Sequence, residues 1–149
     1  MDCRQSPEEI RNVAMEFDNA IESKNVELAL SGFADDCEIE LLGARLIGIR
    51  GARKWLDWLY KNLAEVKFVP VTVMVDGSIY FEEFILDGKL HNGVEVRSKQ
   101  AEVLTYENLK IKSLRLYFDR LDFADAVAKG PISRAISRRL VRTSLKGLA

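Results

Sequence analysis

The sequence has few of the residues from which small proteins build cross-links, metal sites and catalytic triads. It contains two cysteines and one histidine among 149 residues. Cys3 and Cys37 lie far apart without metal-ligand spacing, which predicts free thiols instead of a disulfide or a zinc site. His91 falls at the tip of an expected hairpin, KLHNG, where a mobile surface residue is favoured over a catalytic base.

Long apolar runs and glycine-rich phosphate loops are also missing. No stretch approaches the roughly 18 apolar residues needed to span a bilayer, and the N-terminus MDCRQSPEEI lacks the apolar core of a signal peptide. Neither zinc spacing nor the residue order of a triad is present. We therefore expect a cytoplasmic protein that uses no metal and no cofactor.

The composition is that of one soluble domain with an unusual distribution of charge. Hydrophobic residues make up 48% of the chain and charged residues 30%, enough to form a core without covalent cross-links. The net charge is −1, but residues 129–149 contain six cations and no acid. Residues 1–128 therefore carry −7, and we expect a domain over 1–128 followed by a basic segment over 129–149.

Hydrophobic periodicity and turn residues predict helices first and strands afterwards. Ser6-Pro7-Glu8-Glu9 is typical of a helix start, and Asn25 is expected to cap a second helix that ends near Phe33. A third helix is expected over Gly51–Val66. The expected strands are Cys37–Leu42, Phe68–Val75, Ser78–Leu86, the segment ending near Tyr106, and Lys110–Phe118. This order favours an α+β domain with the helices on one face of a curved antiparallel sheet.

Three segments in this order resemble the SnoaL-like and ketosteroid isomerase-like (nuclear-transport-factor-2-like) superfamily. They are FADDCEIELLG at 33–43, IRGARKWLDWL at 49–59 and LKIKSLRLYFDRLDF at 109–123, within a resemblance that covers residues 7–125. The resemblance implies a cone-shaped curved antiparallel sheet wrapped by three N-terminal helices. Because this fold carries isomerases, cyclases, hydrolases and non-catalytic binders, it does not by itself assign a function.

The catalytic positions of ketosteroid isomerase are mostly replaced in this chain. The resemblance places that enzyme's base at Leu41 and its tyrosine at Phe17, and neither side chain can carry a proton. Its protonated carboxylic acid corresponds to a position near Glu102. One of three catalytic positions is therefore kept.

The positions of limonene epoxide hydrolase, another member, are replaced as well. Its water-binding tyrosine and asparagine correspond to Ile39 and Leu41, and its final aspartate corresponds to Leu116. Its arginine–aspartate pair falls at 80–82, where the chain has no arginine. The hydrolase mechanism is not expected either.

Strand parity and the family geometry define a candidate cavity. The period of two places Ile39 and Leu41 on one face and Glu38 and Glu40 on the other, and the resemblance implies that the first face is the cavity side. Asp35 and Asp36 are expected to close a helix and cap a turn. The expected lining is Phe17, Ile39, Leu41, Trp58, Tyr80, Tyr106, Leu114, Leu116 and Phe118. Glu82 and Glu102 are the candidate acid or base if their strand faces point inward; otherwise they lie exposed in cross-strand pairs.

Residues 129–149 predict a separate amphipathic helix after Gly130-Pro131. Cations recur every four residues at Arg134, Arg138, Arg142 and Lys146, opposite Ile132, Ile136 and Leu140. Such a helix suits docking on the acidic body, packing in a homodimer, or an anionic membrane surface that would hold the protein peripherally. Nucleic acid is disfavoured because the segment lacks aromatic side chains for stacking.

Three functions remain open on these grounds. The leading hypothesis is binding of a small apolar molecule in the cavity. The second is a cofactor-free isomerase, cyclase or hydrolase that uses Glu82 or Glu102. The third is an interaction module that acts through the basic helix.

Overall fold

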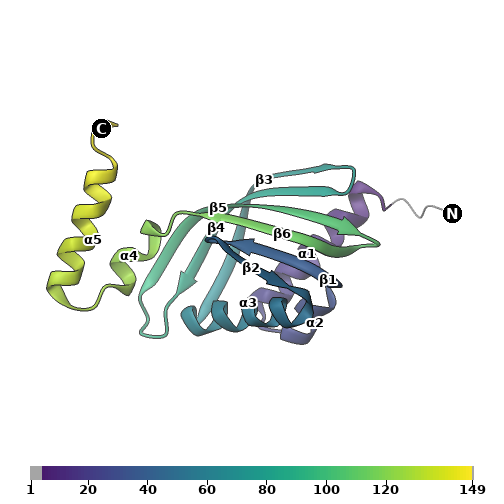
Figure 1. Cartoon of the computed structure of the whole chain (residues 1–149), viewed down its shortest axis with the longest axis horizontal. Coiled ribbons are helices and arrows are strands. Elements are labelled where there is room, and N and C mark those ends of the chain that lie inside the picture. The colour runs from purple at the N-terminus through teal and green to yellow at the C-terminus, as the bar shows by residue number, and fades with distance from the viewer. Residues whose placement is uncertain (1–4, 149) are drawn as a thin grey trace.

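Residues 5–148 are described by a computed structural model, in which helices precede most of the strands and two further helices follow them (Figure 1). The elements are α1 (Pro7–Glu22), α2 (Val26–Ser31), β1 (Phe33–Leu41), β2 (Ala44–Ile47), α3 (Gly48–Asn62), β3 (Glu65–Asp76), β4 (Ile79–Lys89), β5 (Glu95–Glu107), β6 (Lys110–Phe118), α4 (Leu121–Val127) and α5 (Gly130–Ser144). The predicted α+β architecture is confirmed. Cys3 lies outside the described residues, and Cys37 is a buried free thiol.

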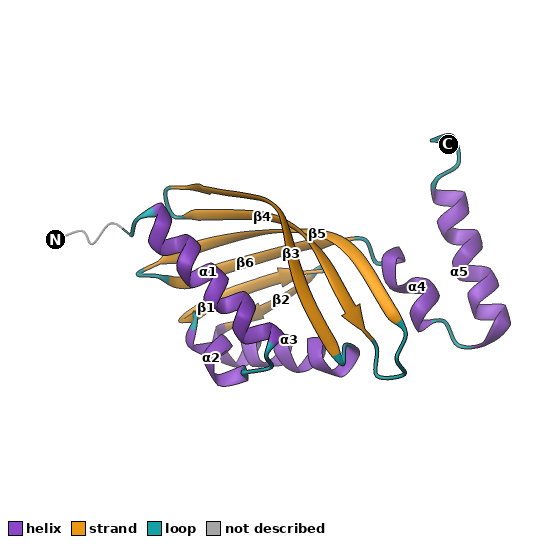
Figure 2. Ribbon diagram, turned by 180° about the vertical axis from the view of Figure 1, so that it is seen from behind, coloured by secondary structure: helices purple, strands orange, loops and turns teal. Residues whose placement is uncertain are grey.

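One curved sheet of six strands, in the order β2-β1-β6-β5-β4-β3, forms the body. Helices α1, α2 and α3 lie along one side of it (Figure 2). All neighbouring strands are antiparallel except β1 and β6, which are parallel. The expectation of a purely antiparallel sheet is therefore wrong at this pair. A long connection between two strands permits parallel pairing, and nearly the whole domain separates β1 from β6.

Helix α1 begins as the sequence predicts and buries one face. Ser6 accepts a hydrogen bond from the Glu9 backbone, and the Glu9 carboxylate accepts one from the Ser6 backbone, which completes a capping box. Phe17 packs edge-on against Phe33 at 5.3 Å between ring centroids and stacks on Trp55 at 6.3 Å. These aromatic contacts fix α1 against the sheet and against α3.

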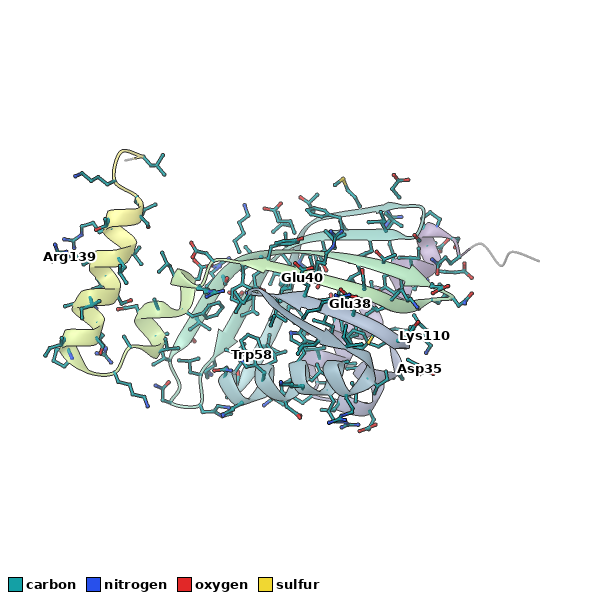
Figure 3. The ribbon with its side chains drawn as sticks, in the orientation of Figure 1. Asp35, Glu38, Glu40, Trp58, Lys110 and Arg139 are labelled. Carbon is teal, nitrogen blue, oxygen red and sulfur yellow. The ribbon has the colours of Figure 1, made fainter. Side chains whose placement is uncertain are left out.

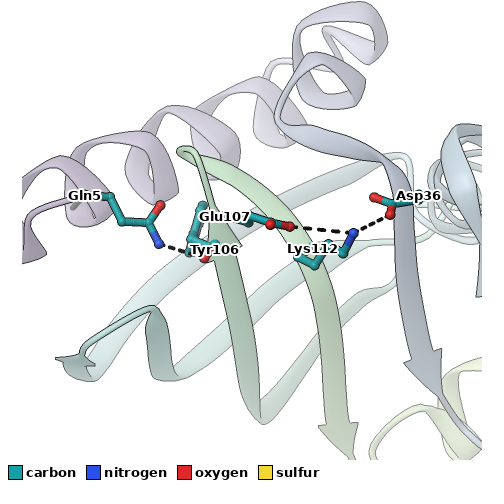
Figure 4. Close-up of polar contacts among 5 residues, drawn as sticks. All are labelled: Gln5, Asp36, Tyr106, Glu107 and Lys112. Atoms are coloured by element: carbon teal, nitrogen blue, oxygen red, sulfur yellow. Dashed lines mark hydrogen bonds and ion pairs between the residues drawn. The ribbon is translucent and has the colours of Figure 1, made fainter. Parts of the chain in front are cut away.

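The acidic segment after α2 belongs to a strand, which corrects the expectation that Asp35 and Asp36 close a helix. Helix α2 ends at Ser31, and β1 already begins at Phe33. Asp36 lies on the exposed face of β1 and forms an ion pair with Lys112 of β6 (Figure 4). Lys112 also lies 3.6 Å from Glu107, so both ion pairs support strand pairing instead of a turn.

A short edge strand, β2, was not predicted, and α3 begins earlier than expected. Leu42 and Gly43 adopt positive φ angles of 51° and 78°, which turn the chain so that β2 pairs back on β1. Glu38 accepts two hydrogen bonds from Arg45 across this pair, at 2.6 and 2.7 Å. Figure 3 shows Asp35, Glu38 and Glu40 along β1.

The predicted C-terminal helix is present as α5, and it extends beyond the sheet (Figures 1 and 2). It packs mainly on α4, and Arg138 approaches Asp125 of α4 at 3.4 Å. The apolar row Ile132, Ile136 and Leu140 remains exposed, with 77% of Ile132 accessible to solvent. In the described part of the chain, no helix has the length and apolar character required to cross a membrane.

Candidate functional site

The site is built on one row of residues that crosses the sheet. Strand pairing aligns Leu41, Leu116, Glu102, Glu82 and Val73 on β1, β6, β5, β4 and β3 in turn. Glu82 and Glu102 are direct partners in this row, and both are buried, with 2% and 7% of their surfaces exposed. The inward orientation, which the sequence left open, is therefore the one observed.

Helix α1 adds a third acid that the sequence reasoning missed. Asp18 follows Phe17, and ligand oxygen atoms of Asp18, Glu82 and Glu102 all lie within 4.8 Å of one another. We call these three residues the carboxyl cluster. Asp18 could have been found from helical spacing, because it lies four residues after Ala14 and three before Ile21, on the buried face of α1.

The carboxyl cluster binds protons more tightly than ordinary carboxylates. Burial raises the pKa of Asp18 to about 8, with smaller contributions from the charges of Glu82 and Glu22. Burial also raises the pKa of Glu102 well above its usual value, and Asp18 and Glu82 raise it further. The pKa of Glu82 is raised by burial as well, although a hydrogen bond with Tyr80 partly offsets this effect. With the pKa of Asp18 near 8, the cluster therefore keeps at least one proton near neutral pH.

Two buried tyrosines accompany the carboxyl cluster. The Tyr80 and Tyr106 rings meet edge to face, with 6.5 Å between their centroids. Burial, together with the nearby carboxylates, raises the pKa of both phenols, so they stay protonated. The buried Tyr106 hydroxyl has no hydrogen-bond partner within residues 5–148. Its backbone carbonyl accepts a bond from Gln5 (Figure 4).

The carboxyl cluster lies at the inner end of a cavity of about 1220 Å³. Six of the residues expected at the cavity line it, namely Phe17, Trp58, Glu82, Glu102, Leu116 and Phe118. Trp58 is on α3 (Figure 3). The lining also includes Asp18, Phe84, Gln100 and Phe123, which the sequence did not indicate.

Five residues expected at the cavity wall are instead buried outside it, namely Ile39, Leu41, Tyr80, Tyr106 and Leu114. This placement is a correction, and for Ile39, Tyr80 and Leu114 it follows from the register of the sheet. Leu41 shares the row of the carboxyl cluster but stands on β1, three strands away from Glu82. Ile39, Leu114, Leu104 and Tyr80 form the row beside the carboxyl cluster, and this row is buried in the core. Strand parity identified the inward face correctly but could not tell which part of that face the core fills.

The outer part of the cavity is formed by the β4–β5 turn, α4 and α5. His91 lines it, is exposed, and has its Nε2 atom 2.9 Å from the backbone oxygen of Tyr60. Near the start of α4, Asp119 accepts a hydrogen bond from the Leu121 backbone at 2.8 Å. From α5, Arg134 and Arg138 contribute to the lining. The two ends of the cavity therefore differ in charge.

The carboxyl cluster offers two kinds of chemistry. Its oxygen atoms match the ligand preference of hard divalent cations. The raised pKa values of Asp18 and Glu102 favour retained protons, and a protonated carboxyl is a poor metal ligand. The cluster can therefore hold a proton or, once ionised, a divalent cation.

Comparison with known proteins identifies relatives of the fold. A family model described as a SnoaL-like domain matches residues 14–114. No curated protein matches the sequence. A putative SnoaL-like polyketide cyclase from Jannaschia sp. CCS1 is 14% identical, with a TM-score of 0.75 over 85% of this chain and 98% of the other. An NTF2-like protein of unknown function from Burkholderia pseudomallei K96243 is 16% identical, with a TM-score of 0.74 over 81% and 98%.

A structure described as an LEH-like epoxide hydrolase from M. tuberculosis is also similar. It is 19% identical, with a TM-score of 0.69 over 86% of this chain and 96% of the other. Because all three identities are low, these similarities concern the fold alone.

Proposed function

Since the chain belongs to the SnoaL-like domain family, we propose that its cavity is a cofactor-independent acid–base site for a small, largely apolar carbonyl compound. The observation that carries this proposal is the carboxyl cluster: three acids with oxygen atoms within 4.8 Å of one another, at the inner end of a cavity with apolar and aromatic walls. A binder of apolar molecules gains nothing from such a cluster, because burying carboxyl groups that lack ion-pair partners costs folding free energy.

The chemistry requires one ionised and one protonated carboxyl in the same place. A carboxylate of the cluster removes a proton from the carbon next to the substrate carbonyl, while a protonated carboxyl donates a hydrogen bond to the carbonyl oxygen. The enol that forms regains its proton at the same or another carbon, so no atom is gained or lost. Shared protons allow Glu82 and Glu102 to exchange these two roles.

Proton transfer suits this site better than hydrolysis. A hydrolase must hold a water molecule, and the positions of Ile39 and Leu41 provide buried aliphatic side chains where limonene epoxide hydrolase has polar ones. Phe17, at the position of the tyrosine in ketosteroid isomerase, cannot donate to an oxyanion. In this chain the donor would come from the carboxyl cluster itself. The fold relatives described as a polyketide cyclase and an epoxide hydrolase are consistent with acid–base chemistry in such a cavity.

The proposal is tested by hydrogen exchange into 2-tetralone, a small apolar ketone, in D₂O. Wild-type protein is expected to accelerate deuterium incorporation next to the carbonyl, and Glu82→Gln or Glu102→Gln to slow the protein-dependent rate about 100-fold or more. Glu83→Gln is the matched control, because Glu83 follows Glu82 on the opposite face and pairs with Lys99 at 2.8 Å. The proposal would be contradicted if wild-type protein incorporated deuterium no faster than buffer alone. It would also be contradicted if Glu83→Gln slowed the protein-dependent rate as much as Glu82→Gln or Glu102→Gln does.

A second candidate function, self-association through α5, is favoured by the exposed row Ile132, Ile136 and Leu140. Helix α5 packs mainly on α4 and leaves this apolar row in water, so a partner that covers the row would stabilise the helix. We propose that a second copy of the chain covers this row. Ile136→Glu is then expected to shift a dimer to monomer in sedimentation-velocity ultracentrifugation. A wild-type monomer, or wild-type protein that instead sediments with anionic vesicles, would contradict dimer packing.

A further inference from the structure

The cavity carries opposite charge at its two ends. The carboxyl cluster occupies the inner end, whereas Arg134 and Arg138 of α5 and Lys129 before it line the outer end. Arg97 and Arg120 also line it. Cations therefore gather where a ligand would enter.

Several of these cations have partners that reduce their availability. Arg97 lies 3.6 Å from Asp87, and Arg120 donates to the Leu42 backbone oxygen at 3.0 Å. Arg138 lies 3.4 Å from Asp125. By contrast, Arg134 and Lys129 form no ion pair within the described part of the chain.

Acidic side chains near the outer end do not cancel this positive charge. Asp122 accepts a 2.6 Å hydrogen bond from Ser98, Asp125 pairs with Arg138, and Glu95 is the third acid in the lining. Arg134 and Lys129 add charge that these acids leave unmatched. An anion at this end would be attracted, and the same anion at the inner end would be repelled by the carboxyl cluster.

Helix α5 presents its cations to the cavity on one face only. Arg134 and Arg138 are four residues apart and therefore lie on the same face, and both line the cavity. Arg139 is rotated by about 100° from Arg138 and does not line it. Figure 3 shows Arg139 on the side of α5 that points away from the body. The helix therefore supplies its own matched control.

We propose that the cavity takes an amphipathic carboxylate: an apolar body between the aromatic walls, its anionic group at Arg134 and Lys129, and its reactive end at the carboxyl cluster. This inference rests on the proposed function and names the class of substrate for the same site. The opposite charges at the two ends fix the direction in which the molecule enters. A neutral molecule of the same shape would fill the apolar walls but would lack this orientation.

The experiment is isothermal titration calorimetry with octanoate and 1-octanol, two ligands whose carbon chains have equal length but whose head groups differ in charge. Wild-type protein is expected to bind octanoate about tenfold more tightly than 1-octanol, the difference expected from one charge-assisted hydrogen bond. The double variant Arg134→Gln, Lys129→Gln is expected to remove that preference and to leave 1-octanol binding unchanged. Arg139→Gln, which changes charge on the other face of the same helix, is expected to bind both ligands as wild type does.

Three outcomes would overturn the inference. Equal affinity of the wild type for both ligands would remove the anion site. If Arg139→Gln weakens octanoate binding as much as the double variant does, the ligand is attracted by the overall charge of α5 and not by a defined anion site. Binding of neither ligand would overturn this inference and remove support for an apolar cavity. If the first outcome is found while the protein still accelerates deuterium exchange into 2-tetralone, only the substrate class is overturned and the proposed function stands.

Discussion

Glu82 on β4 and Glu102 on β5 are direct cross-strand partners, and both side chains point into the buried side of the sheet. Two like charges in this position oppose sheet pairing. Asp18 adds a third acid to the same place. The fold can accommodate this arrangement when the carboxyls retain protons.

The first prediction concerns stability against pH. Because the folded pKa of Glu102 lies above its unfolded value of 4.5, the folded state binds more protons, and stability must fall as pH rises from about 4.5 toward the folded pKa. Each pKa unit corresponds to about 1.4 kcal/mol. Glu102→Gln should flatten this slope and match or exceed the wild-type free energy of unfolding at neutral pH, measured by urea denaturation. An unchanged slope would contradict the burial of a protonated Glu102.

The second prediction concerns the role of Asp18. When Asp18 is ionised, its charge raises the pKa of Glu102, so Asp18→Asn should lower that pKa and move the rise of the 2-tetralone exchange rate to lower pH. Glu16→Gln, an exposed change of equal charge on the same helix, should leave the profile in place. A profile that moves equally in both variants would show a general charge effect instead of a local one.

The third prediction concerns metal ions. Protonated carboxyls bind divalent cations weakly, so excess Mg²⁺ or Mn²⁺ should leave the melting temperature and the exchange rate unchanged at neutral pH. The measurement is thermal unfolding followed by circular dichroism, with and without each ion. A rise in melting temperature that Glu102→Gln abolishes would instead make the cluster a metal site.

The fourth prediction concerns the contact that holds α3 against β2. A Cβ atom at Gly51 would lie 2.8 Å from the Leu46 carbonyl carbon, so Gly51→Ala must push backbone segments apart. We expect a loss of roughly 1–3 kcal/mol in the free energy of unfolding. Arg50→Ala, an exposed neighbouring change, should cost much less. If the two variants lost the same free energy of unfolding, the close packing of Gly51 on Leu46 would not be what makes Gly51→Ala destabilising.

The fold could be predicted largely because its helices and turns carry local signals. The capping box at Ser6 and Glu9 and the strand Lys110–Phe118 appear where the sequence places them. The segment after α2 was misinterpreted because its aspartates resemble caps locally, whereas Asp36 is held by Lys112, a residue far away in sequence. Local patterns cannot show such a partner.

The site could be predicted only in part, for a similar reason. Parity placed Glu82 and Glu102 on a common face, but their burial depends on which rows of the sheet the helices cover. The sequence does not single out Asp18, because its role depends on the folding that brings Glu82 and Glu102 of two distant strands close to it. Predicting that Arg134 lines the cavity requires knowing where α5 lies relative to the sheet, and the pattern of apolar and basic residues along α5 does not specify this.

The most direct measurement is a ¹³C NMR titration of the glutamate carboxyl groups, with signals assigned through Glu82→Gln and Glu102→Gln. Buried, mutually repelling carboxyls are expected to titrate above 4.5, with Glu102 still binding its proton after the exposed Glu9, whose pKa is lowered by its hydrogen bonds to Ser6, has lost its own. Removal of either member should also lower the midpoint of the other, because the two protons are shared. Midpoints near 4.5 for both residues, independent of each other, would contradict the acid–base site.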